Sequence, residues 1–236
     1  MTDFKQIYST QAAQYERLVA REDTDGNILK ALQAIRPLHQ ADVVEWGAGT
    51  GRLTSLLAPL VQSIHAFDQS PAMLAVAQRK LQKSSAENWY TARSRFGFAV
   101  ADHRSIPLPD HSADICIEGW AFGHFVGWHP ANWREEAGRA LAEMERLLRP
   151  GGAMILLETL GTGFETPTPP EQLRPFYHWL ETEHNFQHTW IRTDYHFASQ
   201  TEAAELLNFF FGPEMAAHAQ TRFPECTGIW HRAASR

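Results

Sequence analysis

The sequence predicts one α/β domain in which a mostly parallel, doubly wound sheet is covered by helices on both faces. Two observations carry this prediction. Short apolar runs alternate with segments of helical spacing along most of the chain. A glycine-rich turn, at residues 47–51, follows the first of these runs. The composition agrees, because 44% hydrophobic and 20% charged residues in a chain of 236 can fill a sizeable core.

The elements follow in order along the chain. Residues 4–36 are predicted to be helical, with a start at Asp25-Gly26 and an end before Pro37. Ser70-Pro71 and the capping box Ser199-x-x-Glu202 mark two later helix starts. The predicted strands are 42–46, 63–67, 96–100, 113–118 and 153–158. The predicted helices between and after them are 51–58, 71–83, 132–148, 171–183 and 199–211.

The C-terminal third is less regular. Runs at 214–220 and 225–232 predict a terminal antiparallel hairpin, which brings the sheet to seven strands. Gly161 to Pro170 predicts an exposed loop, and the partly alternating residues 190–197 favour an edge strand with an aromatic face. The expected parts of the single domain, 1–236, are an N-terminal helical lid (1–37), a core (38–158), an insertion (159–198) and a C-terminal helix and hairpin (199–236).

Charge and cysteine usage narrow the function. A formal charge of −6 disfavours wide contacts with nucleic acid, which need a basic surface. The N-terminus has no signal-peptide pattern and no apolar run is long enough to span a bilayer, so we expect a cytoplasmic protein, monomeric or homodimeric. Cys116 and Cys226 are too few for a disulfide framework, and no His and carboxylate spacing predicts a metal site.

The turn after the first strand predicts a nucleotide-like ligand. Glu45-Trp46-Gly47-Ala48-Gly49-Thr50-Gly51 removes side chains where a ligand must lie against the backbone. A dinucleotide fingerprint would need its third glycine at position 52, which is Arg52. The second predicted strand ends in Asp68, a carboxylate that can accept both hydroxyls of a ribose.

Four motifs, in order, resemble the class I S-adenosylmethionine-dependent methyltransferases, in particular the small-molecule branch with a type 11 methyltransferase domain. They are the glycine turn, the strand ending in Asp68, the strand running into Asp102, and the segment Ser112 to Gly119 followed by the turn Arg149-Pro150-Gly151-Gly152. The resemblance covers about residues 43–158. It implies a Rossmann-like fold, S-adenosyl-L-methionine as cofactor and S-adenosyl-L-homocysteine as product.

The resemblance also implies cofactor contacts, residue by residue. The glycine turn would meet the methionine portion, Asp68 the ribose and Asp102 the adenine edge. Glu45 would orient the turn or reach the cofactor's amino group through water, and the Glu118 carbonyl would lie near that amino group. The complete implied set is Tyr15, Glu45, Gly47, Ala48, Gly49, Asp68, Gln69, Met73, Ala101, Asp102, His103, Glu118 and Gly119.

The acceptor side is expected in the loop 120–129, after the fourth strand. His124 is the leading candidate for a general base, and the alternative is that it caps or packs a short helix. The candidate substrate residues are Tyr8, Trp120, Trp128 and Tyr195. An acceptor cover is expected from the insertion around 161–190, with Phe176, Tyr177, Trp179 and His184.

The predicted reaction is in-line methyl transfer to a small molecule, through an oxygen, nitrogen or carbon nucleophile. Two alternatives stay open. One is a non-catalytic cofactor-binding or regulatory partner whose acceptor site has decayed. The other is an NAD-dependent oxidoreductase, which offers no account of Arg149-Pro150-Gly151-Gly152.

Overall fold

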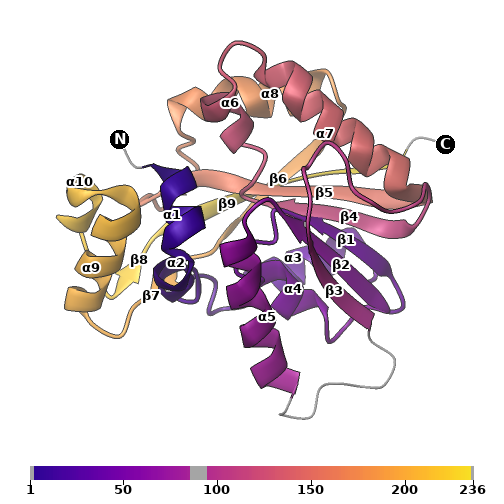
Figure 1. Cartoon of the computed structure of the whole chain (residues 1–236). Coiled ribbons are helices and arrows are strands. Elements are labelled where there is room, and N and C mark those ends of the chain that lie inside the picture. The colour runs from indigo at the N-terminus through magenta and orange to yellow at the C-terminus, as the bar shows by residue number, and fades with distance from the viewer. Residues whose placement is uncertain (1–2, 86–94, 235–236) are drawn as a thin grey trace.

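A seven-stranded sheet forms the centre of the structure, a computed structural model that describes residues 3–85 and 95–234 (Figure 1). The strand order is β3-β2-β1-β4-β5-β9-β6. Neighbours among the first five strands run parallel, whereas β9 runs antiparallel to both β5 and β6. The doubly wound, mostly parallel sheet is therefore confirmed. Its strands are β1 (Asp42–Trp46), β2 (Ser63–Asp68), β3 (Arg95–Val100), β4 (Ala113–Gly119), β5 (Leu148–Thr162), β6 (Gln187–Arg192) and β9 (Glu225–Ala233), and a separate two-stranded sheet joins β7 (Tyr195–His196) to β8 (Arg222–Phe223).

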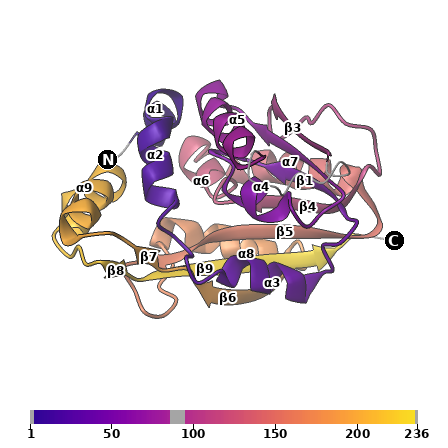
Figure 2. The same cartoon turned by 90° about the horizontal axis from the view of Figure 1, so that it is seen from below.

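Helices lie on both faces of this sheet, as alternating strands and helices require (Figures 1 and 2). One face packs on α3 and α4 through Val43, Ile64 and Ile117, and the other packs on α7 and α8 through Val44, Cys116 and others. The helices are α1 (Phe4–Thr10), α2 (Ala12–Val19), α3 (Asn27–Ile35), α4 (Arg52–Leu57), α5 (Pro71–Ser85), α6 (His124–Trp128), α7 (Trp133–Leu147), α8 (Arg174–Thr182), α9 (Gln200–Phe211) and α10 (Pro213–Ala216), with a 3-10 turn at Glu171–Leu173.

The N-terminal segment is helical, as predicted for 4–36, and α3 begins directly after the predicted start at Asp25-Gly26. It forms three helices, and the chain turns between α2 and α3 where Asp23 adopts a left-handed φ of 58°. The Asp23 carboxylate accepts hydrogen bonds from the backbone N–H groups of Asn27 and Ile28 and so caps α3. Glu22 pairs with Tyr195 as an isolated bridge. Contacts distant in sequence, which helical spacing cannot reveal, therefore divide this segment.

The end of the chain also departs from the prediction in detail. Residues 214–220 do not form a strand, because Gly212-Pro213 starts the short helix α10. The terminal antiparallel pair is present, but β9 pairs with β6 and β5. The edge strand expected near residues 190–197 is found only in part: β6 ends at Arg192 and carries the exposed Trp190, whereas Tyr195 and His196 form β7 of the separate sheet.

The insertion from which an acceptor cover is expected packs through its aromatic side chains. Phe176 and Trp179 of α8 pack against Trp133 of α7, and Tyr177 stacks on Trp230 of β9 at 4.4 Å between ring centroids. His184 packs on Trp179. Phe176, Tyr177 and Trp179 pack into the core on one face of the sheet, and the role of the insertion as an acceptor cover stays a prediction.

The ends of the strands and the N-terminal helices set the position of the site. Strand order reverses between β1 and β4, and open α/β sheets bind their ligands at the carboxyl edge beside such a reversal. Helix α1 lies against α5 at this edge, and Ser70 Oγ donates a hydrogen bond to the Tyr8 carbonyl at 2.7 Å. The N-terminal helices thus cover the place where a nucleotide-like ligand is expected.

Candidate active site at the carboxyl edge

The turn after β1 needs its glycines for conformation and for space. Gly47, Gly49 and Gly51 have φ values of 62°, 54° and 77°, a left-handed region that glycine adopts without strain. A Cβ on Gly47 would lie 2.4 Å from Cβ of Ala121, and one on Gly51 would lie 3.0 Å from Cβ of Ala77. The turn is therefore fitted closely between the loop after β4 and helix α5.

Asp68 ties the end of β2 to this turn. Its Oδ2 accepts from the N–H of Gly49 at 2.8 Å, and its Oδ1 accepts from the N–H of Ser70 at 2.7 Å. Burial raises the pKa of this carboxyl group. Gln69 is exposed beside it and Met73 is buried in the first turn of α5. A half-buried carboxylate beside a bare glycine turn fits a ribose, which offers two hydroxyl donors.

Asp102 lies at the next strand end and is held by an arginine. Arg104 donates to Oδ1 of Asp102 from Nε at 2.7 Å and pairs through Nη1 with Glu136. The guanidinium lowers the pKa of Asp102 to about 2. His103 beside it is buried, and burial lowers the pKa of its imidazole to about 4. Ala101 joins this loop to β2, since its N–H donates to the Asp68 carbonyl at 3.2 Å.

Two acidic residues, Glu45 of the first motif and Glu118 of β4, are buried. Thr54 Oγ1 donates to Oε2 of Glu45 at 2.5 Å, and burial raises the pKa of Glu45 to about 8. Glu118 at the end of β4 accepts from the N–H of Ala121 at 2.9 Å through its Oε2. Glu45 thus braces the glycine turn against α4, and Glu118 braces the loop that begins at Gly119.

Glu158 of β5 is a second brace for that loop, which sequence reasoning missed. Its Oε1 accepts from the N–H of Gly123 at 2.6 Å, and a Cβ on Gly123 would lie 2.9 Å from its Oε2. Burial raises the pKa of Glu158 to about 8, and its charge also raises the pKa of the neighbouring Glu118. The only sequence signal was a single Glu inside the apolar run 153–160. Buried carboxyls at the ends of β4 and β5 therefore hold the turn that leads into His124.

His124, the candidate base, is the first residue of α6 and faces the N-terminal helices. Its Nε2 lies 2.9 Å from the Tyr8 hydroxyl, and its ring stacks on Trp128 at 4.5 Å. Burial lowers the pKa of His124 to about 4, with a further contribution from His103. Tyr15 packs edge-on against Tyr8 at 5.5 Å between ring centroids. The structure therefore brings Tyr8, Tyr15, His124 and Trp128 together. His124 packs at the start of a short helix, and its role as a general base stays a prediction.

The remaining two candidates belong to a neighbouring polar cluster. Trp120 has a left-handed φ of 55° and lies beneath the guanidinium of Arg52, whose CZ is 4.2 Å from the ring centroid. Tyr195 is buried on β7, where the charges of Glu22 and Arg52 reach its hydroxyl. Sequence reasoning treated Arg52 only as the missing third glycine, although a charged residue opening a buried helix was a usable signal.

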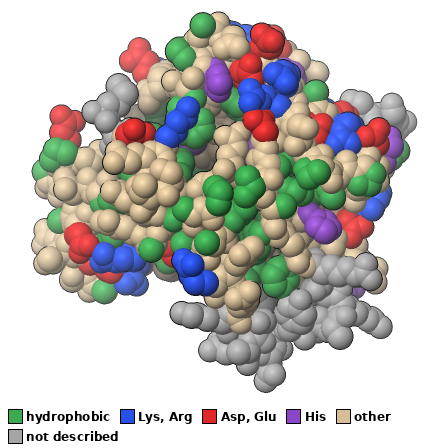
Figure 3. All heavy atoms as spheres, in the orientation of Figure 1, with side chains coloured by type: hydrophobic (Ala, Val, Ile, Leu, Met, Phe, Trp, Pro, Cys, Tyr) green, Lys and Arg blue, Asp and Glu red, His purple; other side chains and the backbone are tan. Residues whose placement is uncertain are grey.

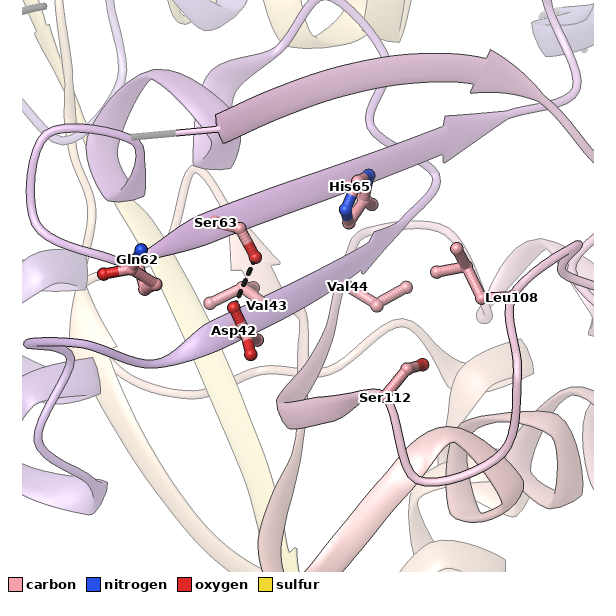
Figure 4. A pocket seen from close by; sticks show the side chains of 8 residues that line it. All are labelled: Asp42, Val43, Val44, Gln62, Ser63, His65, Leu108 and Ser112. Atoms are coloured by element: carbon pink, nitrogen blue, oxygen red, sulfur yellow. Dashed lines mark hydrogen bonds between the residues drawn. The ribbon is translucent and has the colours of Figure 1, made fainter. Parts of the chain in front are cut away.

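A separate cavity of about 460 Å³ lies on the sheet face near the start of β1 and β2 (Figure 4). Ser63 Oγ donates to Oδ1 of Asp42 across one side of it at 2.6 Å, and His65 and Leu108 line it further along. The cavity has no lining residue in common with the predicted site.

Other site classes find no support within the part of the chain that the structure describes. Residues 3–85 and 95–234 contain no group of three or more His, Cys, Asp or Glu side chains arranged to hold a metal ion. None of the helices in these ranges is long and apolar enough to cross a bilayer. Acidic, basic and hydrophobic side chains are interspersed on the face shown in Figure 3.

Comparison with known sequences agrees with this geometry. Residues 44–156 match the family model described as methyltransferase domain. A malonyl-[acyl-carrier protein] O-methyltransferase of Serratia marcescens is 30% identical over 156 residues, which cover 66% of this chain and 52% of that protein. The corresponding protein of Pectobacterium atrosepticum is 29% identical, over 67% of this chain and 53% of its own length. The chain thus spans about half the length of these curated relatives.

Solved structures share the fold. Phosphoethanolamine N-methyltransferase 2 of Haemonchus contortus, in complex with S-adenosyl-L-methionine, superposes with a TM-score of 0.61 at 15% identity, covering 100% of this chain and 60% of that one. A SAM-dependent methyltransferase of Aquifex aeolicus gives a TM-score of 0.56 at 14% identity, over 99% and 94% of the two chains. At these identities the likeness establishes the architecture.

Proposed function

We propose, from the premise that residues 44–156 belong to the methyltransferase domain family, that this chain transfers a methyl group from S-adenosylmethionine to a small-molecule acceptor. The observation that carries the proposal is the bond between Asp68 and Gly49. It joins a ribose-binding carboxylate to a turn without side chains, at the point where strand order reverses. The bound cofactor supplies an activated methyl group on a sulfonium.

The residues on the cofactor side fit that molecule. Gly49 leaves the backbone open to the methionine portion, since the nearest atom to an added Cβ is the Gly47 carbonyl oxygen at 3.9 Å, and Asp68 is placed to accept the ribose hydroxyls. His103 is uncharged at neutral pH because its pKa is about 4, so it adds no positive charge next to an adenine ring. Asp102 shares its carboxylate with Arg104, so an adenine amine would use the lone pairs that remain.

The residues on the acceptor side position a nucleophile and exclude water. His124 is also uncharged at neutral pH, which a group that accepts a proton requires, and its Nε2 faces the hydroxyl of Tyr8. An acceptor with an O–H or N–H group can replace that hydroxyl as donor to Nε2. Helices α1 and α2 then close over the reacting groups, which favours aligned transfer over hydrolysis.

Calorimetric titration tests the proposal directly. The purified chain should bind S-adenosylmethionine and S-adenosylhomocysteine with micromolar affinity and should not bind NAD. Binding of NAD in place of the sulfur nucleosides would support the oxidoreductase alternative. A folded sample that binds none of the three would overturn the proposal. If the nucleosides bind, transfer of a labelled methyl group to candidate acceptors separates an enzyme from a non-catalytic binding partner.

A further inference from the structure

A buried polar cluster lies beside the candidate site and has no place in the cofactor assignments. It consists of Glu22 after α2, Arg52 at the start of α4, Tyr195 on β7 and Glu225 at the start of β9, and we call it the Arg52 cluster. Arg52 Nη1 donates to Oε2 of Glu22 at 2.7 Å. Glu22 pairs with Tyr195 as an isolated bridge, and the charges of Glu22 and Arg52 both act on Glu225 and Tyr195, so the four residues lie close together.

Three polar atoms of this cluster are unsatisfied. Within the described residues, no hydrogen-bond partner is found for Arg52 Nη2, Glu22 Oε1 or Glu225 Oε2. The Glu22 side chain is 4% exposed and Glu225 is 3% exposed. Buried polar atoms in native proteins are nearly always paired with protein, water or ligand. An occupant that offers both kinds of group would satisfy this donor and these two carboxyl oxygens together.

The position of the cluster points to the acceptor. Glu225 pairs in register with Thr162, at the end of β5 and beyond Glu158, whereas Asp68 and the glycine turn lie over β1 and β2. Tyr15 packs against Tyr8, whose carbonyl accepts from Ser70 beside Asp68, and the charges of Arg52 and Glu22 also act on the Tyr15 hydroxyl, so Tyr15 lies near both groups. A molecule in the Arg52 cluster would therefore adjoin the cofactor on the side away from the ribose.

The charge of the cluster narrows the class of occupant. The Arg52–Glu22 pair is already balanced, and burial raises the pKa of Glu225 to about 8, so that carboxyl is mostly uncharged at neutral pH. A lone carboxylate or a lone ammonium would leave a net buried charge, which is unfavourable. A zwitterion keeps the balance. The rings of Tyr15, Trp120 and Tyr195 line the surroundings and favour an apolar or aromatic remainder.

We propose that the Arg52 cluster binds the α-amino-acid group of the methyl acceptor, with the carboxylate on Arg52 Nη2 and the ammonium on Glu22 Oε1 and Glu225 Oε2. This inference rests on the proposed methyl transfer. The cofactor's methionine tail carries the same chemical group, so the experiment must separate the two sources.

The first arm measures cofactor-side binding. Titrate S-adenosylhomocysteine and 5′-methylthioadenosine, which lacks the amino-acid tail, into the wild type, Arg52→Met and Glu225→Gln. Arg149→Met is the matched control, because Arg149 pairs with Asp42 and Asp114 at the opposite edge of the sheet. We expect both affinities to stay within twofold in every variant. A tenfold loss for S-adenosylhomocysteine alone in Arg52→Met would assign the cluster to the cofactor tail and overturn the acceptor assignment.

The second arm measures acceptor-side binding with S-adenosylhomocysteine at saturation. The probes are phenylalanine, tyrosine, tryptophan, leucine and methionine, with phenethylamine and 3-phenylpropionate as controls that each lack one charge. We expect at least one amino acid to bind the wild type and Arg149→Met. The same amino acid should bind at least tenfold more weakly to Arg52→Met and about threefold more weakly to Glu225→Gln. Both control compounds should bind the wild type at least tenfold more weakly than phenylalanine does.

Two results would overturn the inference. One is that none of the five amino acids binds, in which case the cluster holds water. The other is binding that Arg52→Met leaves unchanged. Circular dichroism and the melting temperature show whether each variant is folded. Where Arg52→Met is unfolded, Glu225→Gln decides, because glutamine has the shape of the uncharged acid. Failure of the wild type to bind S-adenosylhomocysteine would instead refute the proposed methyl transfer.

Discussion

The two halves of the carboxyl edge are built in different ways. In the half over β1 and β2, backbone turns and one carboxylate form the site, and residues close in sequence supply them. In the half over β4, β5 and β9, the groups come from distant segments of the chain: Tyr8 lies against His124, and Glu22, which binds Arg52, pairs with Tyr195. A ligand that is the same throughout a family can be recognised by a fixed local motif. An acceptor specific to one protein needs side chains gathered from distant segments.

A substitution at the contact between the two halves should have the largest effect. Gly47→Ala adds a Cβ that would lie 2.4 Å from Cβ of Ala121, in a residue with a φ of 62°. We expect the free energy of unfolding to fall by about 2–4 kcal/mol, from overpacking and left-handed strain together. Urea denaturation measures it. Gly127→Ala is the control, since no described atom lies within 4 Å of its added Cβ. Equal stability of the two variants would contradict this close fit.

Next in size is a change confined to the cofactor half. Asp68→Ala removes the carboxylate that accepts from Gly49 and Ser70 and is placed to meet the ribose. S-adenosylhomocysteine should bind more weakly by about 1.5–3 kcal/mol, roughly 10- to 100-fold, the usual worth of hydrogen bonds to a charged group. Calorimetry checks this, with Asp110→Ala, a surface partner of Arg146, as control. Unchanged affinity would show that the ribose lies elsewhere.

The acceptor half should respond to pH through Glu158. Its pKa is about 8 in the folded chain and near 4.5 in the unfolded chain, so the folded state binds more protons between these values. The contribution of Glu158 to the free energy of unfolding is therefore fully present below about pH 4.5 and is lost as the pH rises to 8. Glu158→Gln, which can still accept from Gly123, should gain stability relative to the wild type over that range.

Urea denaturation of both proteins at several pH values from 4.5 to 8 tests this sign. The difference between them should be smallest at pH 4.5 and grow steadily with pH. Parallel profiles would mean that Glu158 is already ionised in the folded chain. Glu158→Ala, which cannot accept from Gly123, should be less stable than Glu158→Gln at every pH.

The smallest expected effect joins the N-terminal helix to the acceptor half. Tyr8→Phe removes the hydroxyl that lies 2.9 Å from His124 Nε2 and should lower stability by about 0.5–1.5 kcal/mol, with little change in nucleoside affinity. A double-mutant cycle with His124→Asn should give a coupling energy of that order. Coupling near zero would show that this hydrogen bond adds nothing to the closed state.

The two halves of the carboxyl edge also differ in how much of them the sequence predicted. The strand β1 and helices α5 and α7 were predicted to within about two residues, because periodicity and caps act locally. The glycine turn and Asp68 were recognisable for the same reason. The start of α3 was predicted as well, but the break between α1 and α2, the role of residues 214–220 and the core packing of α8 were not.

The candidate acceptor residues show the limit most clearly. Glu22 and Glu225 look like ordinary charged residues in sequence, and only the fold makes them buried neighbours of Arg52. Glu158 differs, because an acidic residue within an apolar strand indicates a buried partner or a shifted pKa. The spacing of these residues along the sequence does not indicate that they meet in the fold.

We expect helix α1 to set the timescale on which ligands exchange. It has seven residues, too few to remain helical alone in water, so it holds its shape only while Tyr8 is anchored to Ser70 and faces His124. We expect it to unfold locally, independently of the sheet, with a low free energy. Residence of a nucleoside beneath it would then be governed by the frequency of that opening. The rate of amide hydrogen exchange in α1 and the rate of product release would then both be set by the local opening of this helix.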